Sequence, residues 1–434
     1  MRAVDLIAAK RDGRELTREE LSWLLRSYQR KKVRDYQVSA WLMAVYFRGM
    51  TARETADLTM AMVESGTRLD LSSLGEFVGD KHSTGGVGDK TTLVVAPLVA
   101  AAGVPVAKMS GRGLGFSGGT IDKLESIKGF RTQLSSEEFI DIARRTRLVV
   151  VAQSPDLAPA DGLLYALRDV TATIESIPLI ASSIMSKKIA AGATGVVLDV
   201  KVGAGAFMKT MESTRELATT MRDIGRNVGL QVRAVISGMD QPLGWAVGNA
   251  LEVREAVQTL RGEGPADLLE VSTTLGAHLL HMAGRVEAVE EGVAQLREVL
   301  ASGRALAKFR EFVEGQGGDS SFIDDPSILP QAPLHAEVPA IHEGYVTAID
   351  AETIGRASVE IGAGRAFKGQ SIDHSVGFVL HKKIGDNVTS GESLATVHAA
   401  TEAGIEVAVR SVLSAFSIAG ERVEPLPTVL EVIQ

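Results

Sequence analysis

The chain has no cysteine among its 434 residues, so neither a disulfide framework nor a thiolate zinc site can form. Long apolar runs are also lacking, since stretches such as residues 93–104 are too short and too broken to span a bilayer. The first five residues, Met1-Arg2-Ala3-Val4-Asp5, carry charges where a signal peptide would have an apolar core. We therefore expect a cytoplasmic protein that does not interact with membranes.

An excess of basic residues is absent too. The chain holds 46 Lys and Arg against 54 Asp and Glu, a formal net charge of -8, whereas nucleic-acid binding usually needs a basic surface. The 45% hydrophobic and 23% charged residues are ordinary for a globular protein, and the length is sufficient for two or three domains. Against this acidic background we expect four cations to form one positive pocket for a small anion. They are Lys81, Lys90, Lys108 and Arg112.

The spacing of apolar residues divides the chain into three parts. The N-terminal part is predicted to be helical, because Thr17-x-x-Glu20 and Thr51-x-x-Glu54 are capping boxes that each open an apolar-periodic run. From about Phe77, short β-branched runs alternate with helical segments, which predicts a mostly parallel sheet covered by helices. These runs are residues 104–108, 148–152, 196–200 and 232–236. The proline-containing residues 317–338 are predicted to be a linker to a small α+β domain.

Residues 81–92 contain the first candidate site. Three glycines, four hydroxyls and two lysines lie there beside His82. Glycines let backbone N–H groups turn toward an anion, and the helix that should follow adds its positive end. The run is neither a Walker A loop, because Asp89 separates Gly88 from Lys90, nor a dinucleotide fingerprint, because its third glycine would fall at Thr91. We predict a phosphate site beside a group that can transfer a proton.

A second polar loop, residues 108–125, follows the next predicted strand. Gly113-x-Gly115-x-x-Gly118 fits the dinucleotide fingerprint, although a chain with 44 glycines produces such a match by chance. Two glycine and hydroxyl loops that each have a lysine after a strand are better evidence for an anion site than one. Ligands of open parallel sheets bind at the carboxyl ends of the strands, where both loops would lie.

A third polar group lies in residues 165–169 and 182–188. If the second segment is helical, Ser183 and Lys187 are four residues apart and share a face. On these residues alone, a solvated charge pattern is the simpler interpretation.

Together these segments resemble the thymidine and pyrimidine-nucleoside phosphorylase family. Residues 110–125 match its signature, Ser-Gly-Arg-Gly-Leu-Gly-x-Thr-Gly-Gly-Thr-x-Asp-x-Leu-Glu, and residues 80–89 match its phosphate loop. Residues 164–193 and 199–209 are similar to the family as well, and the resemblance extends over the whole chain. Two positions depart from the pattern. Ser117 replaces a usual Thr, which keeps the hydroxyl, and Phe116 replaces a common His, which would reshape the pocket wall.

The resemblance implies three domains and a homodimer. A helical domain of residues 1–66, completed by about 160–192, would face a larger α/β phosphate-binding domain of residues 75–159 and 193–316 across a cleft. Residues 317–338 would be the linker, and residues 339–434 a C-terminal α+β domain. The N-terminal helices, with their apolar stripes, are the expected dimer interface.

The resemblance also implies the residues of the site. His82, Arg168 and Lys187 would be catalytic, with His82 near O2 of the base. Phosphate would be held by Lys81, Ser83, Thr92, Lys108, Ser110 and Thr120. The pyrimidine would be held by Arg168, Ser183 and Lys187, and packed by Tyr165 and Phe207. No organic cofactor is implied, since inorganic phosphate is a co-substrate and supplies the nucleophile.

Some relatives also bind a monovalent cation such as K+. The corresponding positions here are Gly88, Lys90, Leu243, Ala246 and Glu255. Lys90 stands where such relatives have Thr. Its ammonium could replace the ion, or it could point away and leave only its backbone carbonyl at the site.

The implied reaction is phosphorolysis of pyrimidine nucleosides to free base and (deoxy)ribose 1-phosphate in nucleoside salvage. Lys108 favours use of uridine, thymidine and deoxyuridine, because broad bacterial relatives have Lys at this position and thymidine-specific relatives tend to have Met. Three alternatives remain. They are a thymidine-restricted phosphorylase, an enzyme like anthranilate phosphoribosyltransferase, and a non-catalytic nucleoside-binding module.

Overall fold

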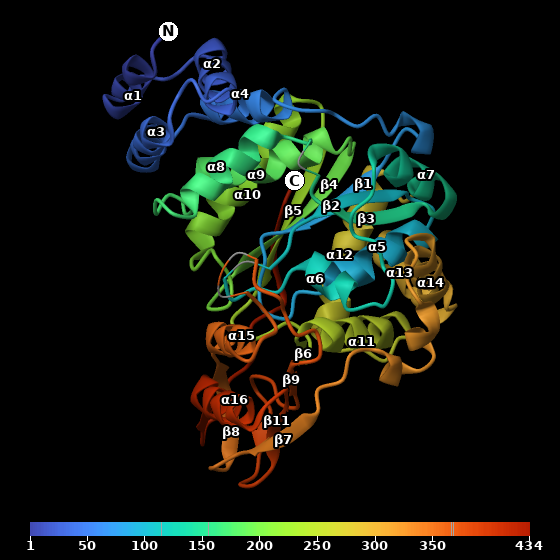
Figure 1. Ribbon diagram of the computed structural model, residues 1–434. Coiled ribbons are helices and arrows are strands. Elements are labelled where there is room, and N and C mark those ends of the chain that lie inside the picture. Colours follow the sequence, from blue (N-terminus) through green and yellow to red (C-terminus); the bar gives the residue numbers. More distant parts are fainter. Residues whose placement is uncertain (114, 155, 366, 368) are drawn as a thin grey trace.

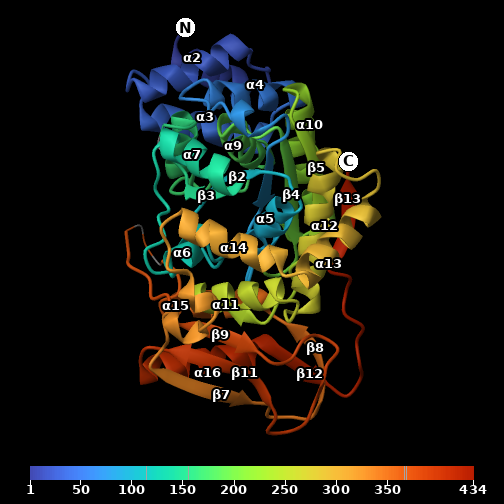
Figure 2. The ribbon, with the colours of Figure 1, turned by 90° about the vertical axis from the view of Figure 1, so that its right-hand side faces the viewer.

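The computed structural model describes residues 1–113, 115–154, 156–365, 367 and 369–434 (Figure 1). A helical bundle at the N-terminus and a small β-rich domain near the C-terminus lie at opposite ends of a central sheet domain (Figures 1 and 2). Leu114 of the glycine-rich signature lies outside the described residues. Among the helices described, none combines the length and the apolar character needed to cross a bilayer.

The N-terminal bundle forms its own core around Trp41 and Leu42. Its helices are α1 (Ala3–Arg11), α2 (Arg18–Gln29), α3 (Asp35–Arg48) and α4 (Ala52–Val63). Both predicted capping boxes are confirmed, because Thr17 caps α2 with Glu20 and Thr51 caps α4 with Glu54. The Glu54 carboxylate also accepts hydrogen bonds from the buried ammonium of Lys10, and this ion pair connects α1 to α4.

The central sheet is parallel except for one edge strand. Its order is β13-β5-β4-β1-β2-β3, and β1 pairs in parallel with both β4 and β2. The strands are β1 (Gly79–Ser83), β2 (Val106–Ser110), β3 (Leu148–Ala152), β4 (Gly195–Val202), β5 (Gln231–Gly238) and the antiparallel β13 (Val429–Ile433). A mostly parallel sheet was predicted, and the structure confirms it.

Helices cover both faces of this sheet and form two separate cores. One core contains side chains of α7 (Ser136–Thr146), α9 (Ile177–Ala190) and α10 (Met211–Asn227). The other contains α5 (Thr91–Ala101), α11 (Asn249–Leu260), α12 (Ala266–Met282), α13 (Val289–Ala301) and α14 (Arg304–Gly315). Short elements complete this region, namely η1 (Ser72–Leu74), α6 (Thr120–Glu125), η2 (Ser320–Ile323) and η3 (Pro326–Ile328), whereas α8 (Pro159–Arg168) packs with the N-terminal bundle.

The described residues of the C-terminal part form two antiparallel sheets and two helices, which confirms the predicted α+β class. One sheet has the order β10-β8-β12 and the other β6-β9-β11-β7. The elements are β6 (Ala246–Val247), β7 (Leu334–Pro339), β8 (Gly344–Ile349), α15 (Ala351–Glu360), β9 (Gly377–Leu380), β10 (Asn387–Val388), β11 (Ser393–Ala399), α16 (Glu402–Ala415) and β12 (Phe416–Ala419). Strand β6 belongs to the central part of the sequence, so this sheet joins the two parts.

The domain limits differ from the prediction in two places. Residues 317–338 are more than a linker, because Phe322 and Ile323 are buried in the central core and β7 already begins at Leu334. Residues 339–434 do not all belong to the C-terminal domain, because β13 returns to the central sheet and pairs with β5. The prolines within residues 317–338 favour a linker, but the apolar Phe322 and Ile323 that precede them supply core contacts. Strand β13 follows Pro425 and Pro427, and its apolar residues pair with the central sheet.

Helix α9 belongs to two cores at once. Leu179 near its start packs with the N-terminal bundle, together with Ala160 and Leu164 of α8. Further along, Met185 and Ile189 pack against the central sheet. The helix that was expected to complete the helical domain therefore also forms part of the sheet domain.

Candidate active site

The first candidate loop begins at the carboxyl end of β1 and ends where α5 starts at Thr91. Gly88 in this loop has a φ of 72°, and a Cβ there would lie 2.6 Å from the carbonyl oxygen of Leu243. Only glycine accommodates both the left-handed backbone and this close approach. The loop therefore packs closely against residues 243–246 without the help of a bound ligand.

Lys81 of β1 points toward α5 and is only 1% exposed. Its ammonium donates to the hydroxyl of Thr91 and lies 3.4 Å from Asp199 and 3.8 Å from Asp89. Burial lowers the pKa of Lys81, against the opposing effect of the two carboxylates. For Asp89, burial raises the pKa, but the charges of the surrounding lysines outweigh it and hold this pKa well below the usual range. The ammonium of Lys81 therefore lies at the N-terminus of α5, where an anion would be stabilised.

His82 and Asp80 of the same strand lie among four lysines. The Asp80 carboxylate is 2.9 Å from the ammonium of Lys188 and 3.7 Å from that of Lys108. Burial first, then the charges of Lys188, Lys108, Lys81 and Lys187, lower the pKa of His82 well below its usual range. The sequence did not reveal this effect, because two of the four lysines come from α9, far along the chain. His82 is therefore a neutral imidazole that can donate a hydrogen bond.

The remaining residues proposed for phosphate lie at the same edge of the sheet. Ser83 and Ser110 end the neighbouring strands β1 and β2, and both are partly exposed. Thr120 begins α6 beside the end of β2, since the N–H of Ile121 donates to the carbonyl of Gly111. Thr92 follows Thr91 in the first turn of α5 and is buried.

The expected pocket of four cations is not what the structure contains. Arg112 is paired with Asp122 and Glu125, and Lys90 is paired with Glu255. Lys108 is 2% exposed, and its ammonium donates to the carbonyl of Lys81 rather than facing an open space. Burial, followed by the charge of Lys188, lowers the pKa of Lys108 well below its usual range.

The residues proposed for the pyrimidine come from α8 and α9. Lys187 donates to Ser183 at 2.8 Å, which confirms that the two share a helix face, and it forms an ion pair with Asp161 at 2.7 Å. The ammonium of Lys187 lies 6.0 Å from the ring centre of Tyr165, and the guanidinium of Arg168 lies 5.9 Å from it. Tyr165 is thus flanked by two cations.

Arg168 has a structural task in addition to any contact with a base. It is 2% exposed, and its guanidinium donates to the backbone carbonyls of three residues. These are Thr173 at 3.2 Å, Ile174 at 2.6 Å and Leu179 at 3.1 Å. Arg168 therefore holds the connection between α8 and α9 in place, with two of its five N–H groups left for a ligand.

Phe207, the other proposed packing residue, stacks on Phe116 with ring centres 5.8 Å apart. The cations of Lys209 and Arg356 lie 5.5 and 5.6 Å from the Phe116 ring centre. A Cβ at Gly355 of α15 would lie 2.7 Å from the Phe116 carbonyl oxygen, so this helix packs directly on the second loop. Phe116, one of the two departures from the signature noted above, thus makes an apolar contact with the C-terminal domain.

Several polar residues of the site escaped the sequence analysis. They are all buried and form ion pairs with one another or with proposed site residues. These residues are Asp80, Asp161, Lys188, Asp199 and Lys201. One signal was available, since β1 reads Gly79-Asp80-Lys81-His82-Ser83 although it is a central strand. Charged residues in the middle of a parallel sheet are costly unless they are paired, and so they indicate a site.

Three family models match the chain. They are the glycosyl transferase family helical bundle domain over residues 4–66, the glycosyl transferase family a/b domain over residues 75–306, and the pyrimidine nucleoside phosphorylase C-terminal domain over residues 345–419. The pyrimidine-nucleoside phosphorylase of Bacillus subtilis is 56% identical over 425 residues, which are 98% of each chain. That of Geobacillus stearothermophilus is 56% identical over 402 residues, 93% of each chain.

A crystal structure of anthranilate phosphoribosyltransferase from Thermus thermophilus is similar in fold alone. Its TM-score is 0.59 at 20% identity, covering 72% of this chain and 99% of that one. The fold and the matched models together define a glycosyl transferase with a helical bundle and an α/β domain. Within this class, the chain belongs to the pyrimidine-nucleoside phosphorylase family.

Proposed function

We propose that the protein catalyses phosphorolysis of uridine, thymidine and deoxyuridine to the free base and ribose or deoxyribose 1-phosphate, as a step of nucleoside salvage. The observation that carries this proposal is the ion pair of Lys188 with Asp80, which joins α9 to β1. Lys187, which we assign to the base, is adjacent to Lys188 on α9. Because Lys188 pairs with Asp80, Lys187 lies near the strand that carries Lys81 and His82. The charge of Lys187 accordingly contributes to the lowered pKa of His82.

The residue types suit this reaction. Phosphate held by Lys81 and the N-terminus of α5 attacks C1′ while the bond from C1′ to the base breaks. The bonding electron pair leaves with the pyrimidine. Arg168 and Lys187 stabilise the negative charge that develops on the base, and neutral His82 donates a hydrogen bond to its O2. The phosphate itself is the nucleophile, so no carboxylate pair of the glycosidase kind takes part.

We also propose that the protein is a cytoplasmic homodimer that assembles through the N-terminal helices. Tyr36 and Phe47 of α3 support this interface, because they are 74% and 77% exposed. Large exposed aromatic side chains are enriched where proteins associate.

The proposed reaction is tested by following the ultraviolet absorbance of uridine or thymidine with and without phosphate. Base release should require phosphate, rise to saturation with its concentration and persist when a chelator is added. Release at the same rate without phosphate would identify a hydrolase. Activity with thymidine but none with uridine would instead establish the thymidine-restricted alternative.

Substrate range should depend on Lys108. One N–H of the Lys108 ammonium donates to the Lys81 carbonyl, and we propose that another donates to the ribose 2′-hydroxyl when the nucleoside binds. We expect Lys108→Met to reduce kcat/KM for uridine by roughly ten- to a hundredfold, because an unmade hydrogen bond to this hydroxyl costs about 1–3 kcal/mol. The variant should fold, since Asp80 keeps its closer ion pair with Lys188 at 2.9 Å. Thymidine, which lacks the 2′-hydroxyl, is the internal control. An equal fall for both nucleosides would show that Lys108 acts on the strand and not on the sugar.

A further inference from the structure

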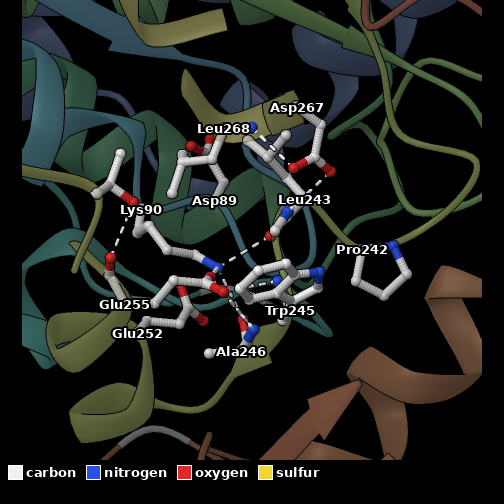
Figure 3. A network of polar contacts seen from close by, with 12 residues as sticks. Asp89, Lys90, Pro242, Leu243, Trp245, Ala246, Glu252, Glu255, Asp267 and Leu268 are labelled. Carbon is white, nitrogen blue, oxygen red and sulfur yellow. Dashed lines mark hydrogen bonds and ion pairs between the residues drawn. The ribbon is translucent and has the colours of Figure 1, made fainter. Parts of the chain in front are cut away.

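Lys90 places an ammonium inside a cage of oxygen atoms. The residue lies just before α5 and is 1% exposed. Its ammonium donates to the carbonyl oxygens of Leu243 at 2.9 Å and Ala246 at 2.8 Å, and to the carboxylate of Glu255 (Figure 3). The three protons of the ammonium therefore have three oxygen acceptors.

The cage is rigid because its parts hold one another. The carboxylate of Glu255 accepts the N–H of Trp245 at 2.7 Å and that of Ala246 at 3.2 Å, so the segment that supplies the carbonyls also fixes the carboxylate (Figure 3). Gly244 has a φ of 70°, and a Cβ there would overlap the Glu255 carboxylate. The backbone thus wraps closely around the ammonium.

Of the five positions implied for a monovalent cation, one is Lys90 itself and three supply the oxygen atoms around its ammonium. Leu243, Ala246 and Glu255 supply the oxygen atoms, and the carbonyl of Gly88 accepts the backbone N–H of Lys90 at 3.0 Å. A hard cation such as K+ prefers carbonyl and carboxylate oxygens of this kind. A second positive charge at the same oxygens would be repelled and would displace a buried ion pair. The residues present therefore do not fit an added K+.

We propose that the Lys90 ammonium is a built-in monovalent cation that makes this protein independent of K+. It is a positioning residue for the phosphate loop. Through Lys90 the loop is fixed to residues 243–246, which continue into β6 and its partner β9 of the C-terminal domain. Lys383 of that domain reinforces the same segment by donating to the carbonyl of Pro242.

The test compares Lys90→Thr with wild type in K+ and in tetramethylammonium, an ion too large for the cage, at equal ionic strength. Melting temperature is measured without substrate, which keeps the outcome independent of the proposed reaction. The wild type should melt at one temperature in both salts. Lys90→Thr, which leaves the buried Glu255 carboxylate without its counter-charge, should melt lower in tetramethylammonium and recover with a saturable K+ dependence.

The activity of the same proteins gives a second readout, which rests on the proposed function. In tetramethylammonium, kcat/KM of Lys90→Thr for phosphate should fall by up to about a hundredfold, because a misplacement of about 1 Å can cost this much. K+ should restore it, mainly through KM for phosphate, and should leave the wild type unchanged.

A matched control is Lys10→Thr in the N-terminal bundle. Lys10 and Glu54 form an ion pair at 2.8 Å that is equally buried, but the acceptors recorded for Lys10 are both oxygens of that one carboxylate. This variant should lose stability that K+ does not restore.

A wild-type melting temperature or activity that rises with K+ would overturn the proposal. So would a Lys90→Thr variant that K+ restores no better than Lys10→Thr. If Lys90→Thr does not fold in either salt, K+ independence of the wild type still decides the proposal.

Discussion

Replacing Lys187 by methionine should lower kcat/KM for pyrimidine nucleosides by about a hundredfold or more. The ammonium is the most exposed of the cations proposed to contact the base, with 22% of its side chain accessible, and it is held at 2.7 Å from Asp161 and 2.8 Å from Ser183. A cation fixed where negative charge develops is worth about 3 kcal/mol in such reactions. Methionine retains the length of the side chain and removes the charge.

The loss should appear in kcat, because the charge on the base is fully developed only in the transition state. Lys187→Arg is the matched variant that keeps the charge and should retain more activity than Lys187→Met. Arg168→Ala should cost a similar factor, but Arg168 also holds three backbone carbonyls, so Lys187 gives the cleaner result. If Lys187→Met stayed within a few-fold of wild type, the assignment of α9 to the base would be wrong.

Asp80→Asn should destabilise the protein by about 3–5 kcal/mol, the usual effect of breaking a buried ion pair from one side. Asp80 is 0% exposed and faces the ammonium groups of Lys188 and Lys108. Asparagine keeps the shape but leaves two buried cations without their counter-charge. Urea unfolding at neutral pH measures the change, provided that the transition remains cooperative.

Asp5→Asn is the comparison for this experiment. Asp5 pairs with Arg2 at 2.7 and 2.9 Å, close to the 2.9 Å between Asp80 and Lys188, but the side chains of Asp5 and Arg2 are both more than half exposed. The change should therefore leave the free energy of unfolding nearly unchanged. Adding Lys188→Met to Asp80→Asn should recover part of the lost stability, because it removes one of the unpaired charges. Equal stability of Asp80→Asn and wild type would contradict the assignment of Asp80 as the counter-charge of the two lysines.

Local sequence signals predicted local structure well. The capping boxes at Thr17 and Thr51 gave the starts of two helices, and the spacing of Ser183 and Lys187 gave their shared face. Both signals depend on residues three or four apart, where the helix alone decides which side chains meet. The glycine loops were equally visible, because their conformations restrict the residue types that can occupy them.

Contacts between distant segments were not predictable in the same way. Nothing near Asp80 in the sequence indicates that Lys188 would neutralise it, and the pKa of His82 follows from that long-range packing. Strand β13 likewise has an ordinary apolar pattern, and only the free edge of β5 decides where it pairs. The family resemblance supplied the site residues, whereas the structure supplied their counter-charges.

The return of β13 to the central sheet means that the C-terminal domain has two covalent attachments. The chain enters it before β7 and leaves it after β12. In topological terms the domain is an insertion within the central domain, not an appendage at its end. Together with the pairing of β6 and β9, the two attachments limit how far this domain can move relative to the two glycine loops.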